Sequence, residues 1–399
     1  MTASTSWLEG ARAAGDASGL ASGLLADDLP APTVQCHAAN LMPLADGSLG
    51  CVWFGGTQEG VADISVWFAR RTAQGWSVPQ QLSHDAARSE QNPILWPAPD
   101  GTLWLLHTAQ RSGHQDTAIV RVRRSTDGGH SWSAPEALLP DTGLFVRHPP
   151  VVHQGRWLLP IWHCRTVGGA RWSGDADDSA VLVSTDAGRS WTEHAVPDSL
   201  GAVHMNIVPA RDGQGLLAFY RSRWADHVWR STSADGVRWS APQPTVLPNN
   251  NSSIQVIRLQ HGTHAGWLAM VFNAISAEQA TERRVSLYDE IEDETEGPDA
   301  TPAATYAAPA AARSAFWGTP RAPMTLALSD DDGLSWPIRR DLETGDGYCM
   351  TNNSAEQRNR ELSYPSLVQT PDGVLHVAYT HHRQRIRHLA ITDDWLSRA

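Results

Sequence analysis

The stretch Ser125-Thr126-Asp127-Gly128-Gly129-His130-Ser131-Trp132 is the clearest copy of a phrase that recurs along the chain. Residues 184–191 and 329–336 repeat it, and residues 233–239 repeat it with one residue deleted. Ser and Asp side chains bond backbone N–H groups inside a turn, and Gly takes the position that needs a positive φ. We therefore interpret Ser-x-Asp-x-Gly-x-x-Trp as a structural device that closes a β-hairpin, with the Trp packed against the sheet below.

The spacing of the phrase predicts the architecture. The tryptophans that close the phrase stand at positions 76, 132, 191, 239 and 336, and the copy at Trp76 is degenerate. A period of about 40–50 residues with several short strands in each unit is typical of a β-propeller. Each unit also opens with a polar residue before a hydrophobic strand. The openings are Cys36-His37-Ala38, Gln91-Asn92-Pro93, Arg147-His148-Pro149, His204-Met205-Asn206, Asn251-Ser252-Ser253 and Ser363-Tyr364-Pro365. Six openings predict an all-β fold, a six-bladed β-propeller.

The chain divides into a leader and one propeller domain. Residues 1–32 are rich in Ala, Gly, Ser and Asp, and we expect a flexible leader or a short helix near residues 8–14. Residues 33–399 form the propeller, whose last outer strand is expected to come from the N-terminal side and close the ring. Residues 276–320 carry an acidic run and then an Ala/Pro-rich stretch without a strand period. This insertion predicts a long surface loop, which either covers the site as a lid or is solvated decoration.

Charge and composition narrow the class of protein. The net charge of −12 argues against a nucleic-acid partner. The four cysteines form no Cys-x-x-Cys pair, so a zinc ribbon is excluded, while two disulfides are allowed but not required. The start of the chain lacks a signal-peptide pattern, and no stretch approaches the length of a membrane span. We expect a cytoplasmic protein with no membrane partner, no cofactor and no metal.

The strand openings also predict where chemistry takes place. The innermost strand of every propeller blade begins at one mouth of the central channel, so residues that open those strands converge there. These residues are His37, Asn92, His148, His204, Asn206, Asn251 and Tyr364. Polar side chains aimed at one funnel predict a binding site for a polar ligand. The alternative is that each one caps a strand or bonds a neighbouring blade.

The repeated phrase is similar to the Asp-box, or BNR repeat, of sialidases, and the resemblance covers nearly the whole chain from His37. Sialidases bind the substrate carboxylate with three arginines, use a tyrosine with a glutamate partner as nucleophile, and use an aspartate as acid/base. Arginine binds a carboxylate through two parallel hydrogen bonds, and a tyrosine can attack an anomeric carbon that carries a carboxylate. The resemblance therefore implies a glycoside hydrolase acting on an acidic oligosaccharide or glycan.

The family pattern can be carried over position by position. Tyr364, in Ser-Tyr-Pro-Ser, matches the nucleophile, and Arg221 and Arg321 match two of the carboxylate-binding arginines. Glu59 lies nearest to the place of the family's acid, and Asp63 is the second choice.

Two positions depart from the pattern. The chain has Cys36-His37-Ala38 where the family has its first arginine, and His204 where it has the glutamate partner of the tyrosine. The chain more closely resembles a divergent sialidase-like branch, which shares Trp53-Phe54-Gly55-Gly56-Thr57-Gln58-Glu59-Gly60.

Three functions follow from this resemblance. The leading prediction is a sialidase-like exo-glycosidase that cleaves a glycosidic bond at or next to an acidic sugar. The second is a uronic-acid-directed lyase or rhamnosidase-type enzyme, because some propeller relatives of this kind cleave rhamnose–uronic acid linkages with histidine as acid/base, and histidine titrates near neutrality. His37, His148 or His204 supplies the base in that case, and Arg383 offers a further donor to the substrate. The third is a non-catalytic carbohydrate-binding propeller.

Overall fold

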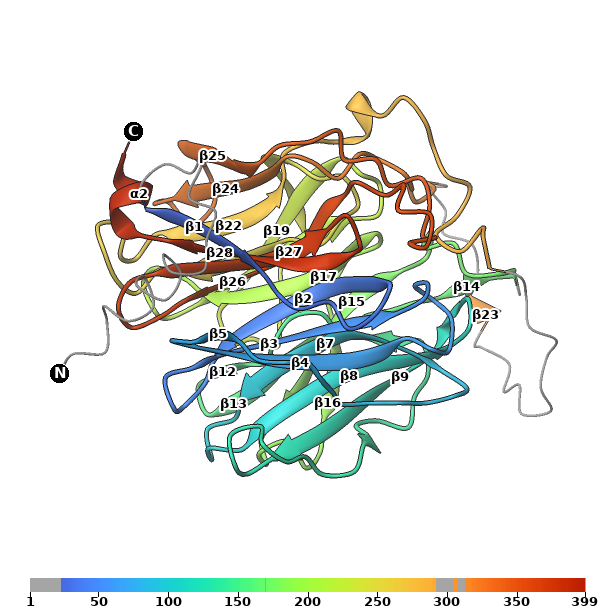
Figure 1. Cartoon of the computed structure of the whole chain (residues 1–399), viewed down its shortest axis with the longest axis horizontal. Coiled ribbons are helices and arrows are strands. Elements are labelled where there is room, and N and C mark those ends of the chain that lie inside the picture. The colour runs from blue at the N-terminus through green and yellow to red at the C-terminus, as the bar shows by residue number, and fades with distance from the viewer. Residues whose placement is uncertain (1–22, 169, 292–304, 307–312, 399) are drawn as a thin grey trace.

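The structure, a computed structural model, describes residues 23–168, 170–291, 305–306 and 313–398. Within these ranges the chain forms six antiparallel sheets arranged as the six blades of a β-propeller (Figure 1). The main strands of blades one to five pair in sequence order from the inner to the outer edge, and blade six takes its outermost strand from the N-terminal side, which confirms the predicted all-β architecture. The predicted helix near residues 8–14 lies outside the described residues.

The strands have the following bounds. Blade one contains β2 (Gln35–Pro43), β3 (Leu49–Gly56), β4 (Ser65–Thr72), β5 (Gly75–Trp76) and β6 (Gln80–Gln81). Blade two contains β7 (Ser89–Pro97), β8 (Leu103–Arg111), β9 (His114–Ser125) and β10 (Glu136–Ala137). Blade three contains β11 (Leu144–Phe145), β12 (Val151–His153), β13 (Arg156–His163), β15 (Asp178–Ser184) and β16 (Thr192–Ala195).

The second half of the ring repeats the plan. Blade four contains β17 (Ala202–Pro209), β18 (Leu216–Ser222), β19 (His227–Ser233) and β20 (Gln243–Pro248). Blade five contains β21 (Gln255–Arg258), β22 (Leu268–Asn273), β24 (Met324–Ser329) and β25 (Ile338–Glu343). Blade six contains β26 (Leu362–Gln369), β27 (Leu375–His381), β28 (Arg385–Ile391) and β1 (Leu24–Asp28). Outside the blades lie β14 (Thr166–Val167), which pairs in parallel with β23 (Thr305–Tyr306), a 3-10 turn at η1 (Ala277–Gln279), and the helix α2 (Asp393–Ser397).

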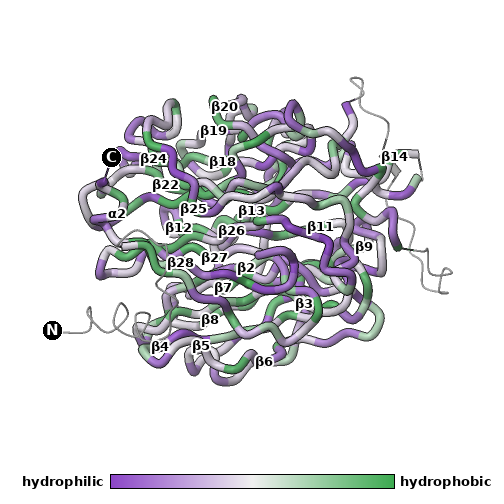
Figure 2. Tube along the Cα trace, turned by 45° about the horizontal axis from the view of Figure 1, so that its top comes forward, coloured by the Kyte–Doolittle hydropathy of each residue, from purple (hydrophilic) through white to green (hydrophobic). Residues whose placement is uncertain are grey.

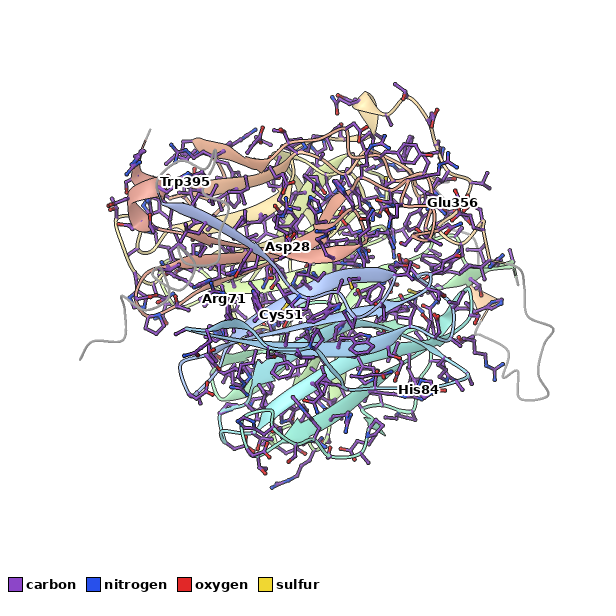
Figure 3. The ribbon with its side chains drawn as sticks, in the orientation of Figure 1. Asp28, Cys51, Arg71, His84, Glu356 and Trp395 are labelled. Carbon is purple, nitrogen blue, oxygen red and sulfur yellow. The ribbon has the colours of Figure 1, made fainter. Side chains whose placement is uncertain are left out.

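The ring closes through the N-terminal strand. β1 pairs antiparallel with β28, from Leu24 opposite Ile391 to Asp28 opposite Arg387, and the blue strand lies beside the red one in Figure 1. Trp395 of α2 packs into the same core cluster as Leu24 (Figure 3). The propeller therefore begins within the predicted leader, at residue 24 and not at residue 33, because pairing with β28 removes an exposed sheet edge.

The repeated phrase forms the same hydrogen-bonded turn wherever it is complete. Asp127 Oδ1 accepts hydrogen bonds from the backbone N–H of Ser131 at 2.9 Å and from the Ser125 hydroxyl at 2.7 Å. The hydrogen bonds from Ser131 hold the pKa of Asp127 well below its usual range. The phrases at residues 184–191 and 329–336 repeat these bonds. Each turn joins the third strand of a blade to the fourth, so the phrase is structural and lies opposite the mouth where the inner strands begin.

A repeated irregularity aims the strand openings at the channel mouth. In five blades, one residue of the strand opening has φ between 48° and 59°. These residues are Ala38, Asn92, His204, Asn251 and Tyr364. In blades one, two, four and six the inner strand shifts register at this point. Such a bulge leaves a residue out of the ladder and re-aims its side chain. A left-handed conformation costs a non-glycine residue roughly 1–2 kcal/mol, and the fold keeps this conformation in five blades.

Apolar side chains fill the spaces between blades. Figure 2 shows hydrophobic segments along β18, β22 and β24. Between blades two and three, Trp157 meets Trp96 and Trp104 edge-to-face at centroid distances of 4.7 and 5.4 Å, a favourable aromatic geometry. All four cysteines are buried and free of disulfides. In the described part of the chain, no helix has both the length and the apolar character needed to span a membrane.

The described parts of the insertion pack over the channel mouth. The Ala277 N–H donates to the Ala225 carbonyl at 2.7 Å, which fixes η1 to the rim of blade four. Arg284 and Trp317 form a bridge between the two arms of the insertion. The Tyr288 hydroxyl lies 3.2 Å from Gln110 Nε2 and 2.9 Å from Gln115 Nε2 in blade two. Of the two alternatives for this segment, the described residues therefore favour a cover over the site.

Candidate active site

Tyr364 lies at the centre of the channel mouth. The bulge of β26 turns its ring inward, where only 6% of the residue is exposed. Its hydroxyl oxygen lies 2.6 Å from Arg221 Nη1 at the end of β18. The guanidinium carbons of Arg147, Arg221 and Arg321 lie 5.4, 5.6 and 5.6 Å from the centre of its ring. Three cations within this distance surround the ring with positive charge.

Arg221 is a buried cation held by neutral partners. Its Nε donates to Asn251 Oδ1 at 2.8 Å, and its Nη1 lies 3.3 Å from His204 Nε2. The face of Trp317 covers it at 5.9 Å. Burial lowers the pKa of Arg221 to about 10, so the group remains charged at neutral pH.

Two other arginines belong to an alternating chain of ion pairs. Arg321 Nη1 lies 2.8 Å from Glu361 Oε2, and Glu361 Oε1 lies 2.6 Å from Arg383 Nε. Arg383 Nη1 in turn lies 2.6 Å from Glu59 Oε2. Burial alone raises the pKa of the Glu361 carboxyl, but Arg321 and Arg383 outweigh that effect and hold the pKa below its usual value. The two positive and two negative charges of these ion pairs balance one another.

The cluster as a whole carries excess positive charge. Four buried guanidinium groups, from Arg147, Arg221, Arg321 and Arg383, face the two carboxylates of Glu59 and Glu361. Arg147 and Arg221 contact carbonyl, hydroxyl, amide and imidazole groups, not carboxylates. The surplus is two positive charges. Because an unpaired buried charge is costly, this arrangement is adapted to receive anions.

Two of the three predicted histidines line the Tyr364 ring. The His37 ring lies 4.4 Å from it and the His204 ring 5.7 Å, between centroids. His37 Nδ1 is 2.8 Å from the Thr380 hydroxyl, while its Nε2 has no partner. His148 is buried, and neither of its ring nitrogens has a hydrogen-bond partner among the residues that the structure describes. Burial, reinforced by nearby arginines, holds the pKa of all three well below the ordinary value of 6.5, so each imidazole is neutral.

The structure does not bring every predicted residue to Tyr364. The Asn206 side-chain oxygen accepts the Val256 N–H at 2.9 Å and so ties blade four to blade five, which is the structural alternative for that residue. The Asp63 carboxylate accepts the Thr57 N–H at 3.1 Å and closes its own loop. Asn92 is buried in blade two, and its side-chain oxygen has no partner.

Three residues of the cluster were missed by the sequence reasoning. Arg147 stands in one of the strand openings, but the sequence pattern favoured its neighbour His148 as the site residue. Glu361 precedes Tyr364 by three residues in a loop without a recognisable motif. Ser253 also stands in a quoted opening, and its hydroxyl lies between Arg147 and His204. Their roles depend on contacts between blades, which a local pattern does not reveal.

The described cover leaves little free space at the arginines. The cavity beside Arg321 and Arg383 measures about 10 Å³, and Arg284, Trp317 and Asn352 contribute to its walls. That space is about what one water molecule needs, so a sugar needs the cover to move.

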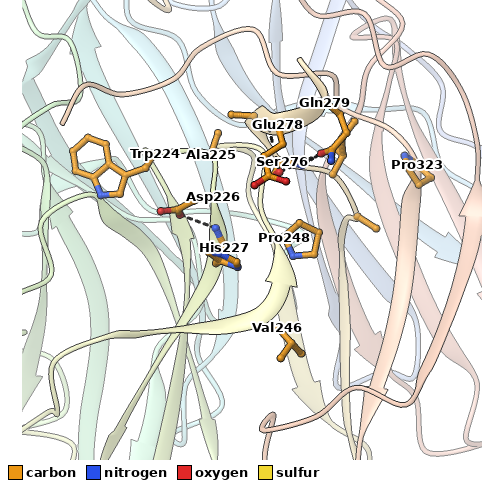
Figure 4. A pocket seen from close by; sticks show the side chains of 13 residues that line it. Trp224, Ala225, Asp226, His227, Val246, Pro248, Ser276, Glu278, Gln279 and Pro323 are labelled. Carbon is orange, nitrogen blue, oxygen red and sulfur yellow. Dashed lines mark hydrogen bonds between the residues drawn. The ribbon is translucent and has the colours of Figure 1, made fainter. Parts of the chain in front are cut away.

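A larger cavity of about 520 Å³ lies between blades four and five (Figure 4). It presents the carboxylates of Asp226 and Glu278 and the indole of Trp224. The Asp226 carboxylate is paired with Arg313 at 2.9 Å, so this cavity lacks the group of buried guanidinium side chains that surrounds Tyr364. Among the residues with described positions, no group of three His, Cys, Asp or Glu side chains could hold a metal ion.

Comparison with known proteins identifies the family. A family model for the BNR repeat-like domain matches residues 47–377. A curated sialidase from Bacteroides fragilis (strain YCH46) is 24% identical over 271 residues, which cover 53% of this chain and 47% of the relative. The chain thus spans about half the length of that relative.

Two solved structures share the fold. The Hadza microbial sialidase Hz136 superposes with a TM-score of 0.63 at 14% identity, over 90% of this chain and 66% of that one. The intramolecular trans-sialidase from Ruminococcus gnavus, in complex with oseltamivir carboxylate, gives a TM-score of 0.61 at 14% identity, over 91% of this chain and 96% of that one. At these identities the likeness shows the fold alone, while the curated relative supports a sialidase-like or glycosidase-like function. Because the family model matches well over half of the chain, the protein belongs to the BNR repeat-like domain family as a sialidase-like member.

Proposed function

We propose that the protein is a sialidase-like exo-glycosidase that hydrolyses a glycosidic bond at or next to an acidic sugar. The observation that carries this proposal is the surplus of two buried positive charges around Tyr364. The carboxylate of an acidic sugar supplies negative charge that matches this surplus. The R. gnavus enzyme, which shares the fold, was solved with a carboxylate-bearing ligand, which supports this assignment.

In this proposal Arg221, Arg321 and Arg383 bind the substrate carboxylate. The third arginine comes from the turn between β27 and β28, and not from the start of blade one where the family carries it. Guanidinium groups suit this role because their paired N–H donors match the geometry of a carboxylate. The deeply buried Glu361 then holds Arg321 and Arg383 in place from behind.

Tyr364 acts as the nucleophile. Arg221 is the hydrogen-bond partner of its hydroxyl, and a guanidinium group only donates, so the tyrosine oxygen accepts. The oxygen forms a bond to the anomeric carbon while the bond to the leaving oxygen breaks, and the leaving oxygen takes a proton from an acid. Glu59, whose carboxyl group lies beside Arg383 in the same cluster, is the candidate acid. Water then attacks the anomeric carbon and gives its proton to the carboxylate of that acid, while the bond to the tyrosine oxygen breaks and the acid is restored.

His204 has a supporting position in this scheme. A base for Tyr364 must reach its hydroxyl directly or through one water. Arg221 instead lies between the two residues, 2.6 Å from the tyrosine oxygen and 3.3 Å from the imidazole. Arg221, and not His204, is therefore the partner of the Tyr364 hydroxyl, at the place where sialidases have a glutamate.

One observation favours the elimination reaction as a second candidate. His37 Nε2 is buried without a partner beside Tyr364, and the imidazole is neutral. A neutral imidazole can remove the proton next to a uronic-acid carboxylate while an arginine neutralises that carboxylate.

A screen on acidic glycans distinguishes the candidates. New reducing ends without the absorbance of an unsaturated uronate indicate hydrolysis, and both signals together indicate elimination. Tyr364→Phe should abolish hydrolysis. Arg238→Ala, at a side chain that is 90% exposed, is the control variant and should keep the activity of wild type. Binding of acidic glycans without either product would leave a carbohydrate-binding propeller.

A further inference from the structure

Arg147 forms the floor beneath Tyr364 and joins four blades. It comes from the segment of blade three between β11 and β12, and only 2% of it is exposed. Its Nη2 donates to the carbonyl groups of Ala39, Tyr364 and Pro365 at 3.0, 3.1 and 3.2 Å. Its Nε donates to the Ser253 hydroxyl of blade five at 3.2 Å. The side chain thus holds the backbone bulge that carries Tyr364 and also fixes one hydrogen bond of Ser253.

The Ser253 hydroxyl connects Arg147 to His204. His204 Nδ1 lies 3.2 Å from Ser253 Oγ, and His204 Nε2 lies 3.3 Å from Arg221 Nη1. A guanidinium group has no acceptor, so Nε2 must present a lone pair to Arg221. The imidazole proton is then on Nδ1 and is donated to Ser253 Oγ. Ser253 Oγ accepts from both Arg147 and His204, and its own hydrogen points to the Ile254 carbonyl at 3.5 Å.

We propose that Arg147 and Ser253 are positioning residues that fix His204 as the tautomer protonated on Nδ1, and thereby hold Arg221 on the Tyr364 hydroxyl oxygen. Ser253 Oγ accepts from both Arg147 and His204, and Arg221 donates both to His204 Nε2 and to the Tyr364 hydroxyl oxygen, so each hydrogen bond in the series has one donor and one acceptor. Reversal of the imidazole would place two donors against each other at 3.3 Å. The neutral state of His204, whose pKa burial and Arg221 hold well below the ordinary value, agrees with this assignment.

The tautomer can be measured without any substrate. In the full chain with ¹⁵N-labelled histidine, long-range proton–nitrogen NMR correlations report which ring nitrogen carries hydrogen. The His204 signals, assigned by comparison with His204→Gln, should show the proton on Nδ1. Ser253→Ala removes the acceptor and should produce a mixture of the two tautomers. Ser252→Ala is the matched control, since the neighbouring hydroxyl is buried and has no partner. A wild-type proton on Nε2, or an unchanged spectrum in Ser253→Ala, overturns the proposal.

The kinetic test rests on the proposed function. Ser253→Ala should lower kcat on an acidic glycoside by about tenfold to a hundredfold, as expected for a misdirected hydrogen bond to a charged group, with little change in KM. Arg147→Lys keeps the positive charge but loses the planar guanidinium group with its several N–H donors. Its kcat should lie between that of wild type and that of Arg147→Met. An equal kcat in wild type and Ser253→Ala overturns the positioning role. If wild type hydrolyses no acidic glycoside, the proposed function fails, and the nitrogen spectra still decide the tautomer.

Discussion

Substitution of Arg221 tests the anion-binding role of the arginine cluster. Arg221→Ala removes a guanidinium that lies 2.6 Å from the Tyr364 hydroxyl and has no carboxylate partner. A bound acidic sugar supplies that missing partner, so the loss should appear in the affinity for acidic ligands and not for neutral ones.

The magnitude follows from one charge-assisted contact. Such a hydrogen bond contributes roughly 1.5–3 kcal/mol, which corresponds to an affinity about 10–150-fold weaker. Arg221→Lys keeps the positive charge but not the planar guanidinium group, and it should lose less affinity for the acidic ligand than Arg221→Ala. Stability changes in both variants combine two opposing effects, because Asn251 loses its donor while a costly buried cation disappears.

Isothermal titration with an acidic monosaccharide and its neutral analogue separates binding from folding. Both Arg221 variants should bind the neutral sugar as wild type does, and circular dichroism should show the same β-sheet content. Equal weakening for the acidic and neutral ligands, or no weakening at all with the fold intact, would show that Arg221 is structural.

Three further predictions concern charge, pH and the cover. Glu361→Gln breaks the ion pairs to Arg321 and Arg383 and should lower the free energy of unfolding by about 3–5 kcal/mol; an unchanged denaturation midpoint would contradict the buried pairing. His37, His148, His204 and His376 are buried with pKa values held well below 6.5, so the unfolded chain binds more protons than the folded one as pH falls. Below pH 6.5 each of these histidines should therefore lower the free energy of unfolding by about 1.4 kcal/mol for every pH unit that the pH falls. Equal urea midpoints at two pH values in this range would refute this prediction. Trp317→Ala uncovers Arg221 and should speed association of an acidic ligand in stopped-flow measurements; an unchanged rate constant means that access does not pass Trp317.

Local patterns predict the blades because their causes are local. The Asp331 carboxylate, for instance, bonds residues at most four positions away, and this turn can be recognised in eight letters. The start of the propeller could not be found in this way, because β1 is identified by its pairing with β28, more than 350 residues later. The insertion likewise shows no period, and its role over the channel depends on contacts with blades two and four.

The site was partly predictable for the same reason. His37, Asn251 and Tyr364 converge because inner strands start at one mouth. Arg221, Arg321 and Arg383 join them because second strands end and third strands begin at the same mouth. Asn206, two residues beyond the bulge residue His204, points to the next blade instead. Glu361 and Arg147 act through partners 40 and 217 residues away, so only the assembled ring shows that they belong to the cluster.

The most direct test of the account is to trap a covalent intermediate on Tyr364. Wild-type protein mixed briefly with an acidic aryl glycoside, then quenched and digested, should yield the peptide that contains Tyr364 with the mass of one added sugar. Tyr364→Phe should release no aryl alcohol and carry no added mass, although it should still bind the acidic sugar. Steady turnover by wild type without an adduct, an adduct on another residue, or substantial hydrolysis by Tyr364→Phe would contradict the account.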